Sequence, residues 1–450
     1  MNVKYKQMDI LNGSLIDKIL MFAIPLAITS ALQQLFNSCD VIVCGKFVGS
    51  LAIAAVGANS SIINLFINLF VGLSVGVNVL ISNYIGREKY NRIPNVTHTA
   101  LTVGLIFGII FVVFGILFSK NILESMGCPD DVIELAALYL RIYFLSMPFV
   151  ILYNFGSAIL RTIGDTKRPL IILVISGIIN VCLNLILVII FNFGVAGVAI
   201  ATVTSNIFNC VLVLILLAKE DSFIKVDFKK PMIDIFSIKR IISIGLPAGL
   251  QGMVFSISNI CIQSAINSLG SKVIAGTAAG INFENFEYFL INAFAQTTVT
   301  FISQNYAAKN YDRCKRTFKW CIILSIISVL TLTMIFYIFI EPLAYIFTNE
   351  KEVVEIIKLR FYIVGLLTCL EISFEVVGGA LRGLGHSILP AIMVFFGTVI
   401  FRILWVYTVF KIFNTYECLI SVYPLSWLII GIASIIVYIK ISKKVLVNTD

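Results

Sequence analysis

Asp40 is a carboxylic acid inside an apolar stretch, LQQLFNSCDVIVC, and other polar side chains accompany it. Gln33, Asn37 and Asp40 are spaced i, i+4, i+7, which places the three on one helical face, pointing into the first half of the chain or into a cleft. Because burial disfavours the charged form of a carboxyl, Asp40 is a candidate proton carrier, or a Na⁺ ligand when ionised. The alternative is a permanently protonated aspartate that only holds helices together.

Two amides, Asn180 and Asn184, lie one helical turn apart in the apolar segment IINVCLN and face the same way. An amide offers an oxygen to Na⁺ but cannot titrate. Asp40 is therefore the strongest titrating candidate in the first half of the chain.

The second half of the chain carries four glutamates within apolar runs. Glu284 and Glu287 are three residues apart, and Glu371 and Glu375 are one turn apart. They could neutralise a cationic substrate, or one of them could pair with Arg402, the one basic residue predicted well within a span. An ion pair of Arg402 with Glu371 or Glu375 is the purely structural alternative for that glutamate.

Membrane-spanning helices must position these groups. Of the 450 residues, 59% are hydrophobic and 13% are charged, against about 25% charged in soluble chains. Runs of roughly 20 apolar residues recur along the chain, which predicts an all-α polytopic membrane protein with 12 transmembrane helices. The predicted spans are 19–42, 51–82, 97–119, 135–160, 170–191, 196–217, 241–266, 274–303, 320–341, 354–381, 389–411 and 421–440.

The charge pattern of the loops predicts the orientation. Lys and Arg gather in alternate connections, among them 87–92, 161–168, 219–240 and 309–319, while the opposite loops are poor in them. The positive-inside rule then places both termini in the cytoplasm, with the chain in the cell membrane. These loops explain the net charge of +9 without a nucleic-acid partner.

The chain contains an internal repeat at an offset of 221 to 222 residues. LRTIGDTKRP from Leu160 and LRGLGHSILP from Leu381 share four positions in register, and Asn37 falls on Asn259 and Asn154 on Glu375. Six spans per copy predict parallel repeats, with an N-lobe at 1–218, a cytoplasmic linker at 219–240 and a C-lobe at 241–450. Such pairs of six-helix bundles enclose a cleft in transporters, whereas a duplicated scaffold without a cavity is the alternative.

Several motifs resemble those of the MATE family, the multidrug and toxic compound extrusion transporters: LFNSCDVIVCGKFVGSLAIAAVG, LRTIGDTKRPL, IINVCLN and FISQNYAAKNYDR. The resemblance runs from about residue 15 to about residue 441. It implies a V-shaped pair of lobes and an antiporter that exports amphipathic, often cationic compounds in exchange for Na⁺ or H⁺. Relatives with this Asp40 pattern commonly have an aspartate where Asn184 stands. Glu371 matches an acid of Na⁺-coupled relatives, but their acid in the seventh span is absent here, at Phe255 or Ser256.

These observations predict a secondary antiporter that works by alternating access, and a flippase or dedicated metabolite exporter is the alternative. We expect ion or proton coupling at Asp40, Asn180, Asn184, Glu371 and Glu375. We expect the substrate cleft to involve Gln33, Asn37, Asn154, Asn259, Glu284, Glu287 and Arg402. No enzyme motif or ATP-binding loop occurs. Ten Cys without a Cys-x-x-Cys pair and two distant His predict no metal centre, and we expect a monomer with no cofactor beyond the coupling ion.

Overall fold

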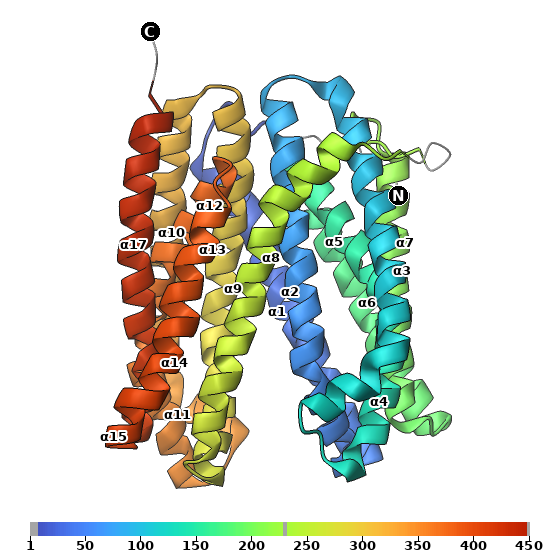
Figure 1. Cartoon of the computed structure of the whole chain (residues 1–450), viewed down its shortest axis with the longest axis vertical. Helices are drawn as coiled ribbons and strands as arrows, with labels where there is room; N and C mark the ends of the chain where they lie inside the picture. The colour runs from blue at the N-terminus through green and yellow to red at the C-terminus, as the bar shows by residue number, and fades with distance from the viewer. Residues whose placement is uncertain (1–7, 228–231, 448–450) are drawn as a thin grey trace. The chain divides into compact units, whose positions relative to one another are not determined.

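The computed structural model describes residues 8–227 and 232–447, and these residues form helices and loops without a strand (Figure 1). They divide into two compact units: unit 1 contains Ile28–Gly249 together with Met8 and Asp9, and unit 2 contains Ile10–Ala27 and the chain from Leu250 onward. The first parts of helices α1 and α8 are thus assigned to a different unit from their second parts. The sequence predicts an N-lobe that ends at 218 and a C-lobe that begins at 241, whereas the boundaries of the two units of the structure fall within α1 and within α8.

The helices that begin before residue 220 are α1 (Ile16–Val43), η1 (Cys44–Val48), α2 (Ser50–Gly86), η2 (Tyr90–Arg92), α3 (Ile93–Ser125), α4 (Asp130–Phe144), α5 (Met147–Thr162), α6 (Lys167–Leu185), η3 (Ile186–Ile190) and α7 (Gly194–Lys219). The helices that follow are α8 (Ile235–Asn267), α9 (Ser271–Ala307), α10 (Tyr311–Phe347), α11 (Lys351–Ile363), η4 (Gly365–Glu371), α12 (Ile372–Gly383), α13 (Ile388–Val394), η5 (Phe395–Ile400), α14 (Phe401–Trp405), η6 (Val406–Phe410), α15 (Lys411–Phe413), α16 (Tyr416–Ile420) and α17 (Val422–Val445).

Each of the twelve predicted spans is helical. Within the described ranges, nine helices are long and apolar enough to cross a membrane, and the bent pair α4 and α5 makes a tenth. The eighth and tenth predicted spans correspond to α9 and to the series α11, η4 and α12, which carry the four glutamates. The fold is therefore the all-α polytopic membrane architecture that the sequence predicts.

The fourth and tenth predicted spans are not continuous helices, which corrects the sequence-based picture. The fourth is broken between α4 and α5 with a bend of 46°, and Pro148 lies in the first turn of α5. Proline lacks the amide proton, so Pro148 cannot donate the backbone hydrogen bond that would continue α4 into α5. The tenth span contains the 3₁₀ segment Gly365–Glu371 at the equivalent place in the repeat.

Close helix contacts build each unit. In unit 1, α5 packs on α3, and a Cβ added at Gly108 of α3 would lie 2.4 Å from the Cα of Pro148. Only glycine admits so close a backbone approach. In unit 2, α9 lies beside both α10 and α12 (Figure 1). This places the glutamates of α9 and α12 in the interior of unit 2.

Candidate functional site

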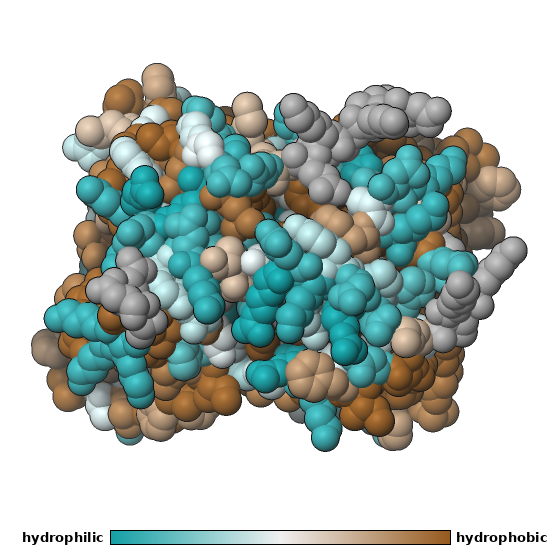
Figure 2. Space-filling model, turned by 90° about the horizontal axis from the view of Figure 1, so that it is seen from above, coloured by the Kyte–Doolittle hydropathy of each residue, from teal (hydrophilic) through white to brown (hydrophobic). Residues whose placement is uncertain are grey.

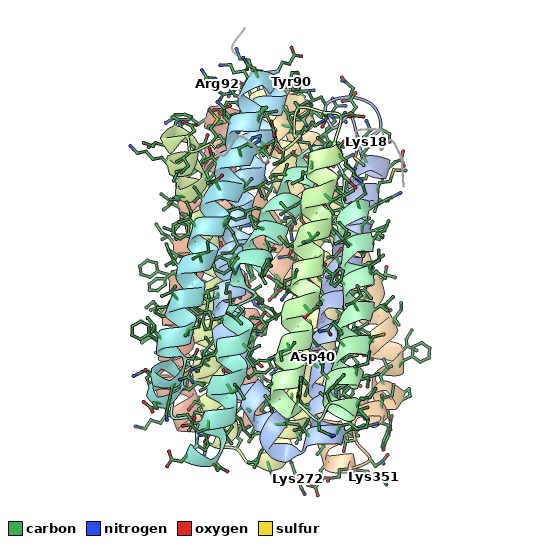
Figure 3. The ribbon with its side chains drawn as sticks, turned by 90° about the vertical axis from the view of Figure 1, so that its right-hand side faces the viewer. Lys18, Asp40, Tyr90, Arg92, Lys272 and Lys351 are labelled. Carbon is green, nitrogen blue, oxygen red and sulfur yellow. The ribbon has the colours of Figure 1, made fainter. Side chains whose placement is uncertain are left out.

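Asp40 lies in a buried polar group in unit 1. Its carboxylate accepts a hydrogen bond of 2.5 Å at Oδ1 from Nδ2 of Asn184, on α6, and one of 3.2 Å at Oδ2 from the hydroxyl of Thr202, on α7. Nδ2 of Asn184 also lies 3.3 Å from Oδ1 of Asn180. Asp40 is 6% exposed and Asn184 is fully buried. Figure 3 shows Asp40 well below Tyr90 and Arg92, which lie at the upper end of the helices.

The hydrogen-bonding capacity of this group is only partly used. The single hydroxyl proton of Thr202 faces two acceptors, Oδ2 of Asp40 and the carbonyl of Val198 at 3.0 Å. Oδ1 of Asn184 is buried and has no hydrogen-bond partner among the described residues. The group thus holds an unused oxygen beside a carboxylate in an apolar environment, which is a costly arrangement for a purely structural contact.

The backbone around Asp40 and Asn184 is irregular. α1 passes into the π-helical turn Cys44–Val48 four residues after Asp40, and α6 passes into the π-helical turn Ile186–Ile190 directly after Leu185. The two turns contact each other. π-helical turns are rare and occur frequently at functional sites.

The other predicted polar residues of the first half do not join this group. Gln33 and Asn37 are exposed, although their spacing places them near Asp40 on one helix. Asn154 is half-buried and donates to the carbonyl of Val150 at 2.8 Å. Of the predicted residues, unit 1 thus brings Asp40, Asn180 and Asn184 together, and the cleft positions of the other three stay predictions.

Glu284 is paired with Arg360, a residue that the sequence analysis missed. Nε and Nη2 of Arg360, on α11, donate to the two carboxylate oxygens of Glu284, on α9, at 2.6 and 2.8 Å. Arg360 is 1% exposed. A Cβ at Gly280 would lie 2.9 Å from Cδ of Arg360, so that glycine leaves room for the side chain. The pair is bidentate, the geometry that best matches guanidinium to carboxylate.

Arg402 makes no direct ion pair with Glu371 or Glu375, the structural alternative that the sequence left open, although its charge acts on Glu371. Nε of Arg402 donates to the hydroxyl of Ser426 at 3.1 Å, and Nη1 donates to Oδ1 of Asn259 at 3.3 Å. Its guanidinium lies over the ring of Tyr423, 4.5 Å from the centroid. Its direct contacts are thus neutral partners and an aromatic face, while Glu371 acts on it through its charge. Arg360 also lies over Tyr423, at 5.1 Å.

Glu375 is held by a short polar chain within unit 2. Nε2 of Gln251, on α8, donates to its Oε1 at 3.4 Å, and Nη2 of Arg382 donates to Oε1 of Gln251 at 3.0 Å. All three side chains are buried. Gln251 therefore links the carboxylate of Glu375 to the guanidinium of Arg382.

Glu287 and Glu371 each keep one buried carboxylate oxygen without a hydrogen-bond partner among the described residues. Glu287 is fully buried, and its other oxygen accepts from the hydroxyl of Thr333 at 2.6 Å. A carboxyl in this state is stabilised by a proton or a cation at the bare oxygen. Unit 2 thus contains two further carboxyls that could bind a proton or a cation.

Two repeated bundles of membrane helices with buried carboxyls and amides define the class: a polytopic membrane transporter. The MatE family matches residues 25–186 and 247–408, and the chain belongs to this family of transporters, which are not enzymes. The two matched segments are offset by 222 residues (247 − 25 = 222). This confirms the family resemblance and the internal repeat.

Individual relatives agree with that assignment. The probable multidrug resistance protein YoeA of Bacillus subtilis is 27% identical over 384 residues, which cover 84% of this chain and 83% of YoeA. The multidrug export protein MepA of Staphylococcus aureus is 24% identical over 335 residues, 74% of each chain.

Solved structures share the fold. A MOP superfamily transporter from Pyrococcus furiosus superposes with a TM-score of 0.91 over 99% of both chains at 22% identity. An outward-facing multidrug resistance MATE family transporter superposes with a TM-score of 0.90 over 99% of both chains, also at 22% identity.

Proposed function

We propose that this chain is an antiporter of the cell membrane that exports lipophilic, often cationic compounds in exchange for Na⁺ or H⁺. The names of the relatives, multidrug resistance and multidrug export proteins, support the substrate class. The observation that carries the coupling mechanism is the buried group of Asp40, Asn184 and Thr202.

This group is compatible with both charge states of Asp40. When the carboxylate is ionised, the amide of Asn184 and the hydroxyl of Thr202 donate to it. When Asp40 is protonated, Thr202 can turn its proton to the carbonyl of Val198 and accept the proton of Asp40 instead. Na⁺ is the alternative to the proton at this site, and Oδ1 of Asn184, which has no hydrogen-bond partner among the described residues, is an available ligand oxygen for it. Either ion neutralises the carboxylate, so ion binding and release can alternate with substrate binding.

The second unit supplies further coupling and charge-neutralising groups. The bare oxygens of Glu287 and Glu371 favour a proton or a cation there. Glu284 is already neutralised by Arg360, which leaves it a positioning role. We therefore assign cation recognition to Glu287 and Glu371 before Glu284.

A second candidate function is an exporter or flippase for an anionic metabolite or lipid-linked saccharide. The observation in its favour is the set of guanidinium groups that are buried beside the glutamates and amides of unit 2, at Arg360, Arg382 and Arg402. Arginine suits phosphate and carboxylate recognition. All three already have partners, so this candidate ranks second.

The proposed orientation places both termini in the cytoplasm, and we propose that the chain acts as a monomer. Basic residues follow one set of helix ends, as the positive-inside rule requires. Figure 2, the view from above, shows hydrophilic side chains gathered over these helix ends and hydrophobic ones around them.

The direct test is efflux of a fluorescent lipophilic cation from proteoliposomes under an imposed Na⁺ gradient or an imposed pH gradient. We expect one of the two gradients to accelerate efflux, and that gradient identifies the coupling ion. Liposomes without protein are the control. If neither gradient accelerates efflux by folded protein, while an anionic lipid-linked substrate crosses the membrane, the second candidate replaces the first.

A further inference from the structure

A cavity of about 330 Å³ opens in unit 1 at the end of the helices that carries the basic loops. The loop between α2 and α3 contributes Lys89 and Arg92, and the first turn of α8 contributes Phe236 and Ser237. Figure 3 shows Arg92 and Tyr90 at this upper end. The transport proposal uses none of these residues.

The repeat shows what such a loop binds. The loop between α9 and α10 has the same backbone: Lys309 has φ 59° where Glu88 has φ 57°, and the amide of Asn310 donates to Asn305 at 2.8 Å as that of Lys89 donates to Tyr84 at 2.9 Å. Arg313 stands there at the position of Arg92, 221 residues later (313 − 92 = 221).

Arg313 is saturated with oxygen acceptors. Its Nε, Nη2 and Nη1 donate to the carbonyls of Ile10, Asn12 and Gly13 at 3.0, 2.9 and 3.0 Å, in the segment that precedes α1. The side chain of Arg92 lines the cavity, where its charge acts on Asp234, and no comparable cluster of carbonyl oxygens surrounds it among the described residues. At equivalent positions of the two repeats, Arg92 therefore lines a cavity, whereas Arg313 donates to a cluster of carbonyl oxygens.

The charges around the cavity favour an anion. Lys89 and Arg92 line it, and the guanidinium of Arg240 lies 5.6 Å from the ring centroid of Phe236, another lining residue. Among the described lining residues Asp234 is the acid, and the charge of Arg92 acts on it. Its oxygens are occupied by the amides of Phe236 and Ser237 and by the hydroxyl of Ser237.

Apolar side chains stand beside these cations. Met232, Ile233, Ile235 and Phe236 are 42 to 66% exposed at the start of α8. A free phosphate makes no favourable contact with such an apolar surface. A phospholipid contacts both parts, with its phosphate on the cations and its acyl chains along the apolar side chains. The interface between headgroups and hydrocarbon is where loops of this kind lie.

We propose that this cavity binds the phosphate of an anionic phospholipid, with Lys89 and Arg92 as the phosphate ligands and the start of α8 as the surface for the acyl chains. Guanidinium and ammonium groups on phosphate oxygens make strong, charge-assisted hydrogen bonds. The site shares no residue with the Asp40 group, and lipid binding there does not require that the protein transports a substrate. Failure of the antiport proposal therefore leaves it standing.

The test is native mass spectrometry of the full chain in detergent, titrated with phosphatidylglycerol and with phosphatidylcholine of the same acyl chains. We compare the wild type with the double variant Lys89→Gln/Arg92→Gln. The matched control is Lys443→Gln/Lys444→Gln, which removes two exposed lysines from the last turn of α17. Size-exclusion profiles verify folding, and the single variant Arg92→Gln replaces the double variant if the latter aggregates.

We expect the wild type and the control to prefer phosphatidylglycerol, and the cavity variant to bind it about thirtyfold more weakly, because each cation near an anionic lipid contributes about a factor of five. Equal phosphatidylglycerol binding by variant and wild type, or equal loss in variant and control, would overturn the proposal. Displacement of the lipid by millimolar inorganic phosphate would overturn the lipid assignment in favour of a free-phosphate site.

Discussion

The side chain of Asp40 is the centre of the proposed coupling mechanism, and of its two hydrogen-bond partners Asn184 is among the coupling residues expected from the sequence, whereas Thr202 is not. The one-turn spacing of Asn180 and Asn184 predicts that both amides face the same way, and the hydrogen bond between them confirms it. The sequence did not predict the contact of Thr202 with Asp40, because Thr202 lies on α7 and the spacing of residues within one helix does not show which residues of another helix it meets. The exposure of Gln33 and Asn37 shows that helical periodicity identifies a face but not what covers it.

Thr202→Val tests the contribution of the hydroxyl to coupling. The variant loses one of the two donors to Asp40, and a hydrogen bond to a charged group contributes about 1.5–3 kcal/mol. We expect gradient-driven efflux to fall about tenfold, measured in proteoliposomes at equal protein. Thr204→Val is the matched control, because the hydroxyl of Thr204 donates only to the carbonyl of Ile200 on the same helix. A T202V variant as active as T204V would remove Thr202 from the mechanism.

Arg360→Met tests the ion pair in unit 2. It leaves Glu284 without its bidentate partner, and breaking a buried pair costs about 3–5 kcal/mol. We expect the thermal unfolding temperature in detergent to fall clearly, and Glu284→Gln/Arg360→Met to lose less than the sum of the two single variants. Lys272→Met, which breaks the exposed pair with Glu352, serves as control and should leave the unfolding temperature nearly unchanged. Additive losses would show that the pair is not coupled.

The sequence could not predict this pair for a physical reason. Arg360 lies near the start of the predicted span 354–381, where a basic side chain is cheap because it can reach the interface. The structure instead buries it against α9, beside Gly280. Which glutamate an arginine meets depends on how helices pack, and hydropathy carries no information about that.

At the scale of the helices, hydropathy located the spans but not their irregularities. The break between α4 and α5 coincides with Pro148, but the equivalent 3₁₀ segment in the tenth span has no proline within Gly365–Glu371. The π-helical turn after Asn184 lies in the apolar sequence ILVII, and the turn after Asp40, CGKFV, is apolar apart from Lys46. These departures depend on tertiary contacts, which a single segment does not encode.

Asp234 is the N-cap of α8, and Asp234→Ala tests its contribution to stability. The carboxylate accepts from the amides of Phe236 and Ser237, and the hydrogen bond from the Ser237 hydroxyl is the main cause that holds the pKa of Asp234 below its usual value. We expect D234A to lose about 1 kcal/mol at pH 7, measured by thermal unfolding. Asp234→Asn should cost little, since asparagine caps equally well.

The same cap has a defined pH dependence. Because the pKa of Asp234 is lowered on folding, its contribution is present above the unfolded value of about 4 and is lost as the pH falls through the folded value. The difference in unfolding temperature between the wild type and D234A should therefore shrink under acid, while that between D234N and D234A should persist. A constant difference between the wild type and D234A down to pH 2 would contradict the capping role.

At the scale of the whole molecule, the repeat is the feature that the sequence predicts best, and the family match confirms it. The two copies have diverged in chemistry. Unit 1 relies on Asp40 with neutral partners, whereas unit 2 contains four glutamates within predicted spans and four buried arginines, at Arg313, Arg360, Arg382 and Arg402. We expect the ion-coupling role of the first copy to be separable from charge balance in the second, since their polar groups share no residue.

The most direct test of the account is gradient-driven efflux by Asp40→Asn beside the wild type and the exposed-acid control Asp221→Asn, in proteoliposomes with the coupling gradient identified above. We expect the gradient to accelerate efflux by the wild type and by D221N but to leave the rate of folded D40N unchanged. Acceleration of D40N to the wild-type rate would contradict it, because coupling would then not pass through Asp40.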